Sequence, residues 1–338
     1  MRIGIVIMVI NLMFLQNFQA QNDDYRNYYK LINRAEYYYF IEHNIDSCFH
    51  NYDKAFHNYD FVFVRDLVIA SEIAYFEGKE YKKYIIQAFK YGLKLDYLKE
   101  IKLFNPIIDS LLNDEELKNE FLSYRKEYLS KINFSYLLFI YDLYLDDQKY
   151  KTITDYETYH LHKLGILKQE IFKYGFPGDK TIGIDCEDIF AEIGKPELDL
   201  NFKKKLNNEY EHVVKFNRDK IFQTNINPFL YHNPNSFCEL EDIFLESLKK
   251  GEIHPRLIGV FYDNMFCSRK KTFIEYKNYN INEGLFMLNP YCRYDLIYFD
   301  RKRINKIREK WFVPPIEVDE SMKEYEKKYG FVCFLNLF

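Results

Sequence analysis

The chain has 338 residues and a formal net charge of −4, and its positive and negative side chains are mixed along the sequence. This balance argues against nucleic acid and against an anionic membrane surface as partners. The length favours two domains and supplies ample material for a hydrophobic core. The 32 Tyr and 31 Phe accompany abundant Lys, Asn and Ile, so we attribute them to an AT-rich coding sequence and to the core rather than to binding.

Residues 1–20 have the anatomy of a secretory signal peptide. Arg2 supplies the positive charge, residues 3–15 are apolar except for Asn11, and Ala20 is a small residue at the expected cleavage point. The apolar stretch is short for a membrane span, and no later stretch reaches about 18 apolar residues. We therefore predict an exported protein, periplasmic or secreted, whose mature chain has no membrane span. An uncleaved anchor is the alternative.

Small residues recur between Tyr29 and Gly92 at positions where two packed helices would touch: Ala35, Cys48, Ala55, Ala70, Ala74 and Ala88. This pattern resembles the tetratricopeptide repeat, a helix–turn–helix unit of about 34 residues. The match is degenerate, because the Trp and Pro of the full signature are missing, and any packed helix pair also favours small residues. Helices expected at 105–112 and 114–132 would add a third unit or a cap. Residues 21–132 are therefore predicted to be helical repeats.

Residues 133–338 are predicted to form a second, irregular helical domain. Asp155 and Ser236 are expected to cap helices, and residues 179–185 are expected to be extended. Apolar periodicity and Gly or Pro stops predict helices at 134–147, 156–174, 187–193, 202–222, 236–250, 256–266, 300–310 and 321–329. The predicted fold class is all-α, with tetratricopeptide-like hairpins followed by this domain.

Several short motifs follow one another in the second half of the chain: Asp147-Gln148, Tyr174-Gly175-Phe176-Pro177, Tyr231-His232, Ile253-His254-Pro255 and Tyr262-Asp263. Their order is similar to that in an uncharacterised family of exported bacterial proteins. In that family a degenerate helical-repeat half precedes a domain of unknown function, so the resemblance implies an architecture and no activity. Lys151 stands where the family pattern has Arg.

Export would place the six cysteines in an oxidising compartment. Cys48 occupies a small-residue position of the repeat, so we expect it to be buried and free. The other five either form one or two disulfides or remain buried thiols: Cys186, Cys238, Cys267, Cys292 and Cys333. The spacing contains no C-x-x-C pair, which argues against a zinc knuckle and a thioredoxin motif.

Two E-x-x-H pairs, Glu157 with His160 and Glu209 with His212, fall on predicted helices. Di-metal carboxylate bundles use two such pairs together with two further Glu. Two pairs are little above what chance gives a chain of this composition, and no further Glu can be nominated. We therefore predict no metal, and these four residues stay as minor candidates.

His232, His254 and Asp263 are the most suggestive catalytic candidates. The two histidines lie next to or near prolines in predicted turns, where binding residues are common. A histidine and a carboxylate brought together can act as a base and the group that orients it. The alternative is that both histidines simply hydrogen-bond loop backbone. No nucleophile elbow, G-x-G-x-x-G or P-loop is present, so no cofactor is predicted.

Two functions remain open. The preferred one is a non-enzymatic module whose helical-repeat half binds a protein or peptide partner. The alternative is a hydrolase-like or metal-assisted enzyme with its site around His232, His254 and Asp263. The discriminating observation is whether these three side chains converge in an open pocket.

Overall fold

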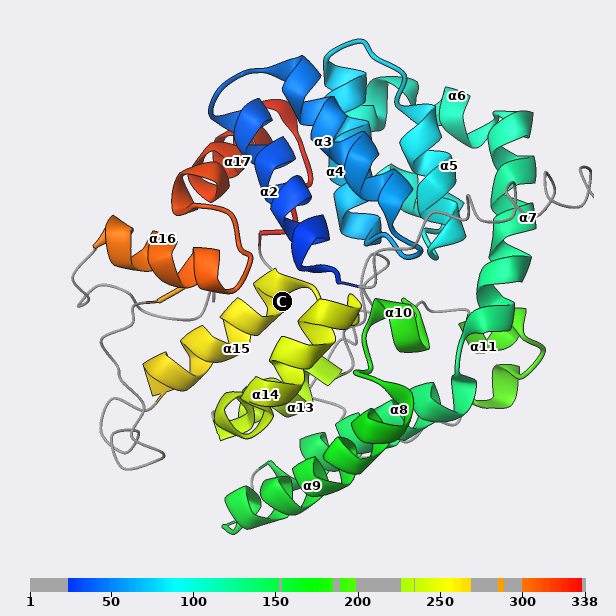
Figure 1. The fold of residues 1–338 in the computed structure, drawn as a ribbon. Coiled ribbons are helices and arrows are strands. Elements are labelled where there is room, and N and C mark those ends of the chain that lie inside the picture. The colour runs from blue at the N-terminus through cyan, green and yellow to red at the C-terminus, as the bar shows by residue number, and fades with distance from the viewer. Residues whose placement is uncertain are drawn as a thin grey trace, which may run out of the picture.

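The computed structural model describes residues 24–151, 154–184, 189–198, 226–233, 235–268, 285–288 and 300–335. Throughout these residues the regular structure is helical and no strand occurs (Figure 1), so the predicted all-α fold is confirmed. None of the described helices combines the length and the apolar character needed to cross a bilayer. The predicted signal peptide at residues 1–20 lies outside the described residues.

The first four described helices form two neighbouring pairs: α2 (Arg26–Phe40) packs on α3 (Ile45–Asn58), and α4 (Val64–Phe76) packs on α5 (Lys82–Lys90). The small residues singled out in the sequence are all buried here with 0% exposure: Ala35, Cys48, Ala55, Ala70, Ala74 and Ala88. Side chains of this size allow helix backbones to approach closely. The tetratricopeptide-like arrangement of the pairs stays a prediction.

Two short 3-10 helices, Leu95–Glu100 and Lys102–Ile107, lead to α6 (Ile108–Leu112) and α7 (Glu115–Lys131), and α7 packs on α5. The chain continues through α8 (Phe134–Tyr150), α9 (Tyr156–Tyr174), α10 (Asp179–Ile182) and α11 (Ile189–Glu192). Asp114 and Asn133 cap α7 and α8, because their side-chain oxygens accept the backbone N–H three residues later.

The last helices bring the chain back to its start. They are α13 (Ile226–His232), α14 (Asn235–Lys250), α15 (Pro255–Ser268), α16 (Arg301–Lys310) and α17 (Ile316–Tyr329). α13 packs on α8, and α14 packs on α15. α17 packs on α2, and Figure 1 shows this contact between the red and the blue ribbon. The predicted domain division at residue 132 stays a prediction.

Some local predictions were wrong. Ser236 does not cap α14, which begins one residue earlier, with Asn233 Oδ1 accepting the N–H of Asn235 at 2.9 Å. α17 begins at Ile316 rather than at residue 321, because Pro315 can start a helix without losing an internal hydrogen bond. Residues 179–182 form a helical turn rather than an extended segment, and the side chain of Asp155 makes no capping bond. The helix predicted at 202–222 lies outside the described residues.

Cys48, Cys238 and Cys333 are buried free thiols. The prediction that Cys48 is buried and free is therefore confirmed. For Cys238 and Cys333, where a disulfide or a buried thiol was expected, the structure shows a buried thiol. Cys186, Cys292 and the side chain of Cys267 lie outside the part of the chain that the structure describes.

A buried network of charged side chains links the first helices to the last ones. Glu36 of α2 pairs with Arg65 of α4 at 3.4 Å and with Arg256 of α15 at 3.4 Å. Asp319 of α17 pairs with Arg256 at 2.7 Å and with Arg308 of α16 at 2.8 Å. The two guanidinium groups hold the pKa of Asp319 at about 2, against burial, which acts in the opposite direction. The network therefore requires α2, α4, α15, α16 and α17 to keep their mutual positions.

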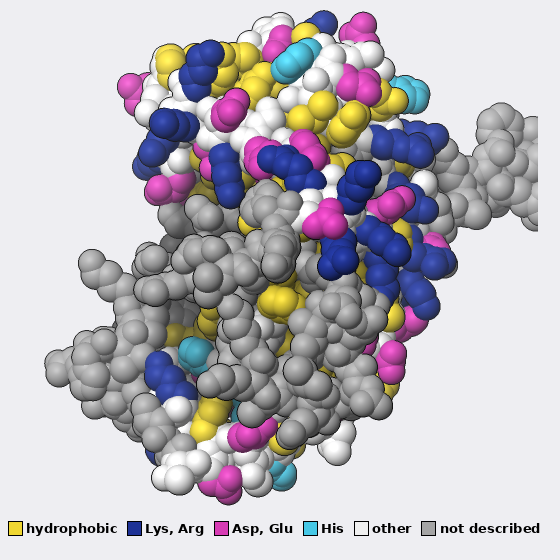
Figure 2. Space-filling model, turned by 90° about the vertical axis from the view of Figure 1, so that its left-hand side faces the viewer, with side chains coloured by type: hydrophobic (Ala, Val, Ile, Leu, Met, Phe, Trp, Pro, Cys, Tyr) yellow, Lys and Arg dark blue, Asp and Glu magenta, His cyan; other side chains and the backbone are white. Residues whose placement is uncertain are grey.

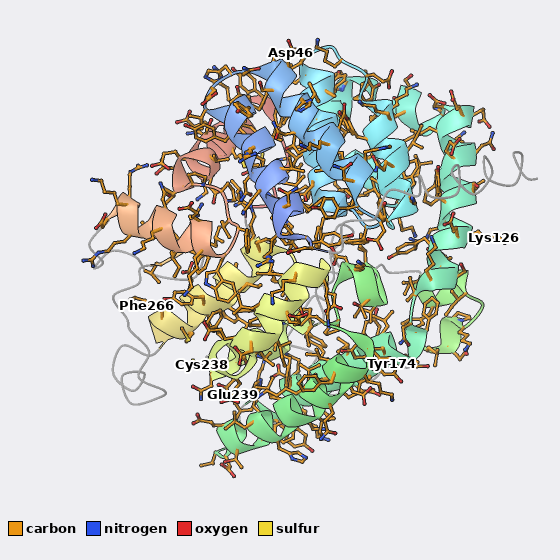
Figure 3. The ribbon with its side chains drawn as sticks, in the orientation of Figure 1. Asp46, Lys126, Tyr174, Cys238, Glu239 and Phe266 are labelled. Atoms are coloured by element: carbon orange, nitrogen blue, oxygen red, sulfur yellow. The ribbon has the colours of Figure 1, made fainter. Side chains whose placement is uncertain are left out.

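The surface carries charges of both signs. Lys and Arg side chains lie beside Asp and Glu over the face shown in Figure 2. Surface pairs also connect elements: Figure 3 labels Glu239 on α14, whose carboxylate accepts from Lys168 of α9 at 2.8 Å. Exposed pairs of this kind contribute little stability, so the buried network and the apolar core hold the fold together.

Candidate functional site

The structure gives each of the three predicted catalytic residues its own set of contacts. Asp263 is buried in α15, and its two oxygens accept the backbone N–H groups of Phe286 at 2.8 Å and Leu288 at 2.7 Å. A carboxylate used in this way fixes the segment 285–288 against α15. The geometry gives Asp263 a structural role.

His254 lies in the turn before α15, next to the buried charge network. Its Nδ1 accepts the N–H of Arg256 at 3.3 Å, while Nε2 lies 3.6 Å from Asp66 Oδ1 and 3.3 Å from Arg65 Nη1. Burial, partly offset by Asp66, lowers the pKa of His254 to about 4. The imidazole is therefore neutral near pH 7, with its proton on Nε2.

A small cavity adjoins His254. Apolar side chains such as Phe63, Phe176 and Leu257 line most of it, and Arg65 and His254 supply polar atoms. The volume open to the centre of a water molecule is about 30 Å³, and one water needs roughly 10–15 Å³ on this measure. The cavity therefore has room for a water molecule or two, and none for a substrate of ordinary size.

His232 ends α13 and contacts a carboxylate that the sequence did not assign to it. Its Nδ1 lies 2.6 Å from Oδ2 of Asp147, on α8, and Asp147 is buried with 0% exposure. Asp147 also accepts hydrogen bonds from Gln148 Nε2 at 3.0 Å and from the hydroxyl of Tyr156. The side chain of His232 is 30% exposed. The pair is the arrangement of a base with its orienting carboxylate.

Two neighbouring helices fix the position of α13, and hence of His232. His160 of α9 donates from Nε2 to the carbonyl of Phe229 at 2.8 Å, and Asn264 of α15 donates to the carbonyl of Tyr231 at 2.6 Å. Both bonds satisfy carbonyl groups in the last turn of α13, where a helix has no internal donors. Burial lowers the pKa of His160, so this ring stays neutral near pH 7.

Of the two E-x-x-H pairs, Glu157 and His160 lie within the described residues, and they do not form a metal site there. Glu157 accepts from Asn235 Nδ2 at 2.6 Å, whereas His160 faces the carbonyl of Phe229, so the two side chains serve different partners. No group of three or more potential metal ligands occurs in the part of the chain that the structure describes. Glu209 and His212 lie outside it.

An open hollow lies on the surface between α3 and α5. We call it the α3–α5 hollow, and its volume is about 670 Å³. Phe56 and Tyr84 are its buried apolar residues. Polar side chains supply the remainder of its lining, among them His50, Asp53, Lys54, His57, Lys83 and Gln87. In contrast to the cavity beside His254, the hollow can receive part of another chain.

No family model, no curated protein and no solved structure matches this chain. A functional assignment must therefore come from the geometry of the described residues. Among the described residues, two places carry chemistry that a partner could reach: the α3–α5 hollow and the ring of His232, whose side chain is 30% exposed.

Proposed function

We propose that the protein binds an acidic segment of a protein or peptide in the α3–α5 hollow. The observation that carries this proposal is an excess of unpaired basic side chains around an open surface depression. His50, Lys54 and His57 are exposed on α3, and none of them has a hydrogen-bond or ion-pair partner among the described residues.

The single carboxylate in the hollow is already neutralised. Asp53 accepts from Lys83 Nζ at 3.1 and 3.2 Å and from the hydroxyl of Tyr84 at 2.8 Å. Lys54 therefore contributes an uncompensated positive charge to the hollow. Complementary charge selects a partner with Asp or Glu side chains and disfavours a basic one.

The shape of the hollow suits a chain segment better than a small molecule. It is open rather than enclosed, and Gln87 of α5 and Asn58 at the end of α3 place amide groups along its lining. Such groups can hydrogen-bond the backbone of a bound segment. The leader predicted at residues 1–20 supports an exported setting, so the partner is expected among periplasmic or secreted proteins.

Fluorescence anisotropy with labelled peptides of about ten residues tests the proposal. An Asp- and Glu-rich peptide is expected to bind, a Lys-rich peptide of equal length is not, and binding should weaken as salt screens the charges. Lys54→Glu should weaken binding about three- to tenfold, because it replaces an attraction with a repulsion. Lys302→Glu on α16, which is exposed and far from α5 in Figure 1, is the matched control. Equal binding of the two peptides, or an unchanged affinity in Lys54→Glu, would refute the proposal.

A further inference from the structure

We propose that His232 is the general base of a second, hydrolytic site that acts on small esters, with Asp147 as its positioning residue. The proposal uses α8, α9, α13 and α15 and is independent of the α3–α5 hollow. Of the three residues expected from the sequence it keeps His232, and Asp147 takes the place of His254 and Asp263.

The hydrogen bonds determine which nitrogen of His232 can react. Nδ1 lies 2.6 Å from Asp147 Oδ2, and an ionised carboxylate can only accept, so Nδ1 carries the proton. In the neutral ring, Nε2 then holds the free lone pair. No hydrogen-bond partner for Nε2 exists among the described residues, and the side chain is 30% exposed. The nitrogen that can accept a proton is thus left available to a bound molecule.

The charges around the ring favour proton transfer to it over transfer of an anionic group. Asp147 is buried, and among the described residues His232 is its ion-pair partner. His232 is also the last residue of α13, where helix carbonyl groups favour positive charge. A phosphoryl group on Nε2 would instead face the carboxylate and the carbonyl ends of the helix.

The pair is also rigid, which a base requires for efficient catalysis. Asp147 is held by Gln148 and Tyr156, and Lys151 Nζ holds Gln148 Oε1 at 2.6 Å. The last turn of α13 is held by His160 and Asn264. A pre-positioned pair of this kind loses little entropy when the transition state forms.

The reaction proceeds through water. Nε2 of His232 takes one proton from a water molecule while the water oxygen bonds to the carbonyl carbon of the ester. The bond from that carbon to the alkoxy oxygen then breaks, and the leaving oxygen takes the proton back from Nε2. The products are a carboxylic acid and an alcohol, and the ring returns to its starting form.

The test is hydrolysis of p-nitrophenyl acetate and p-nitrophenyl butyrate by the purified protein. His232→Gln should lower kcat/KM by about 10²-fold or more, the range that general base catalysis supplies. His162→Gln, an exposed histidine on α9, should leave it unchanged. Free imidazole should restore part of the rate to His232→Ala. Asp147→Asn should lower kcat and alter its pH profile, a result that a purely structural carboxylate would not give.

The result that overturns the proposal is a wild-type rate no higher than that of folded His232→Gln, for both esters. Absence of rescue of His232→Ala by imidazole also counts against it. Because Asp147 is buried, its variant is first checked by circular dichroism, and the variants of the partly exposed His232 decide the matter if Asp147→Asn does not fold. Peptide binding in the α3–α5 hollow is unaffected by either outcome, so the two proposals fail separately.

Discussion

Replacing Asp319 with Asn tests whether the buried charge network holds the two ends of the chain together. Asp319 is 4% exposed and pairs with Arg256 at 2.7 Å and with Arg308 at 2.8 Å. The Asn side chain keeps the shape but loses the charge, so both guanidinium groups lose their shared counter-ion. Among the described residues, Arg256 keeps Glu36 as its counter-ion, and Arg308 keeps the carbonyls of Phe286 and Pro314.

The size of the loss follows from the structure in two ways. The pKa of Asp319, lowered from 3.8 to about 2, corresponds to about 2 kcal/mol of stabilisation of the charged form. Removing one partner of a buried pair costs about 3–5 kcal/mol in other proteins. We therefore expect Asp319→Asn to lower the free energy of unfolding by about 2–4 kcal/mol. Because the pKa is lowered, this stabilisation is present above pH 3.8 and is lost as the pH falls toward 2.

Urea denaturation at pH 7, followed by circular dichroism, measures this loss. Glu320→Gln on the same helix is the matched control, because Glu320 pairs with Arg301 at 2.8 Å and the two side chains are 43% and 47% exposed. Its effect should stay below about 1 kcal/mol. A loss below about 1 kcal/mol for Asp319→Asn would show that the network does not hold these helices together.

Two further predictions concern the core and the pH response. Ala55 is 0% exposed on α3, so Ala55→Leu should overpack the contact with its neighbours and cost about 1–3 kcal/mol in urea denaturation; an unchanged stability would show that the contact has room to spare. His254 is neutral in the folded protein with a pKa of about 4, below the ordinary 6.5. Stability should therefore be full above pH 6.5 and decline by about 2–3 kcal/mol as the pH falls to 4. His254→Gln should flatten this decline, and an identical pH profile in the variant would contradict the assignment.

Local structure could be predicted well because its signals are local. Helix α9 occupies the predicted range of residues 156–174, where apolar residues recur every three or four positions before Gly175. Gly175 adopts φ +88°, a backbone conformation that favours glycine. The burial of Ala35, Ala55 and Ala88 follows the same logic, since a small side chain at helical spacing marks a helix contact.

Partners that come together through the tertiary fold could not be predicted. His232 and Asp147 are separated by 85 positions, and Glu36 and Arg256 by 220. Periodicity and capping carry no information on which helix packs against which. Asp147-Gln148 and Tyr231-His232 both stood out as motifs, yet only the packing of α13 on α8 makes them neighbours. Asp263 was expected to be the carboxylate that orients a histidine base, and its backbone partners Phe286 and Leu288 could not be read from the sequence.

The most direct test of the proposed function is amide hydrogen exchange with and without the Asp- and Glu-rich peptide. Exchange is expected to slow in α3 (Ile45–Asn58) and α5 (Lys82–Lys90), which line the hollow, and to stay unchanged in α8 and α16. The same experiment with Lys54→Glu should show a smaller effect at equal peptide concentration. Protection that appears elsewhere on the molecule, or none at a peptide concentration that saturates the anisotropy signal, would contradict binding in the α3–α5 hollow.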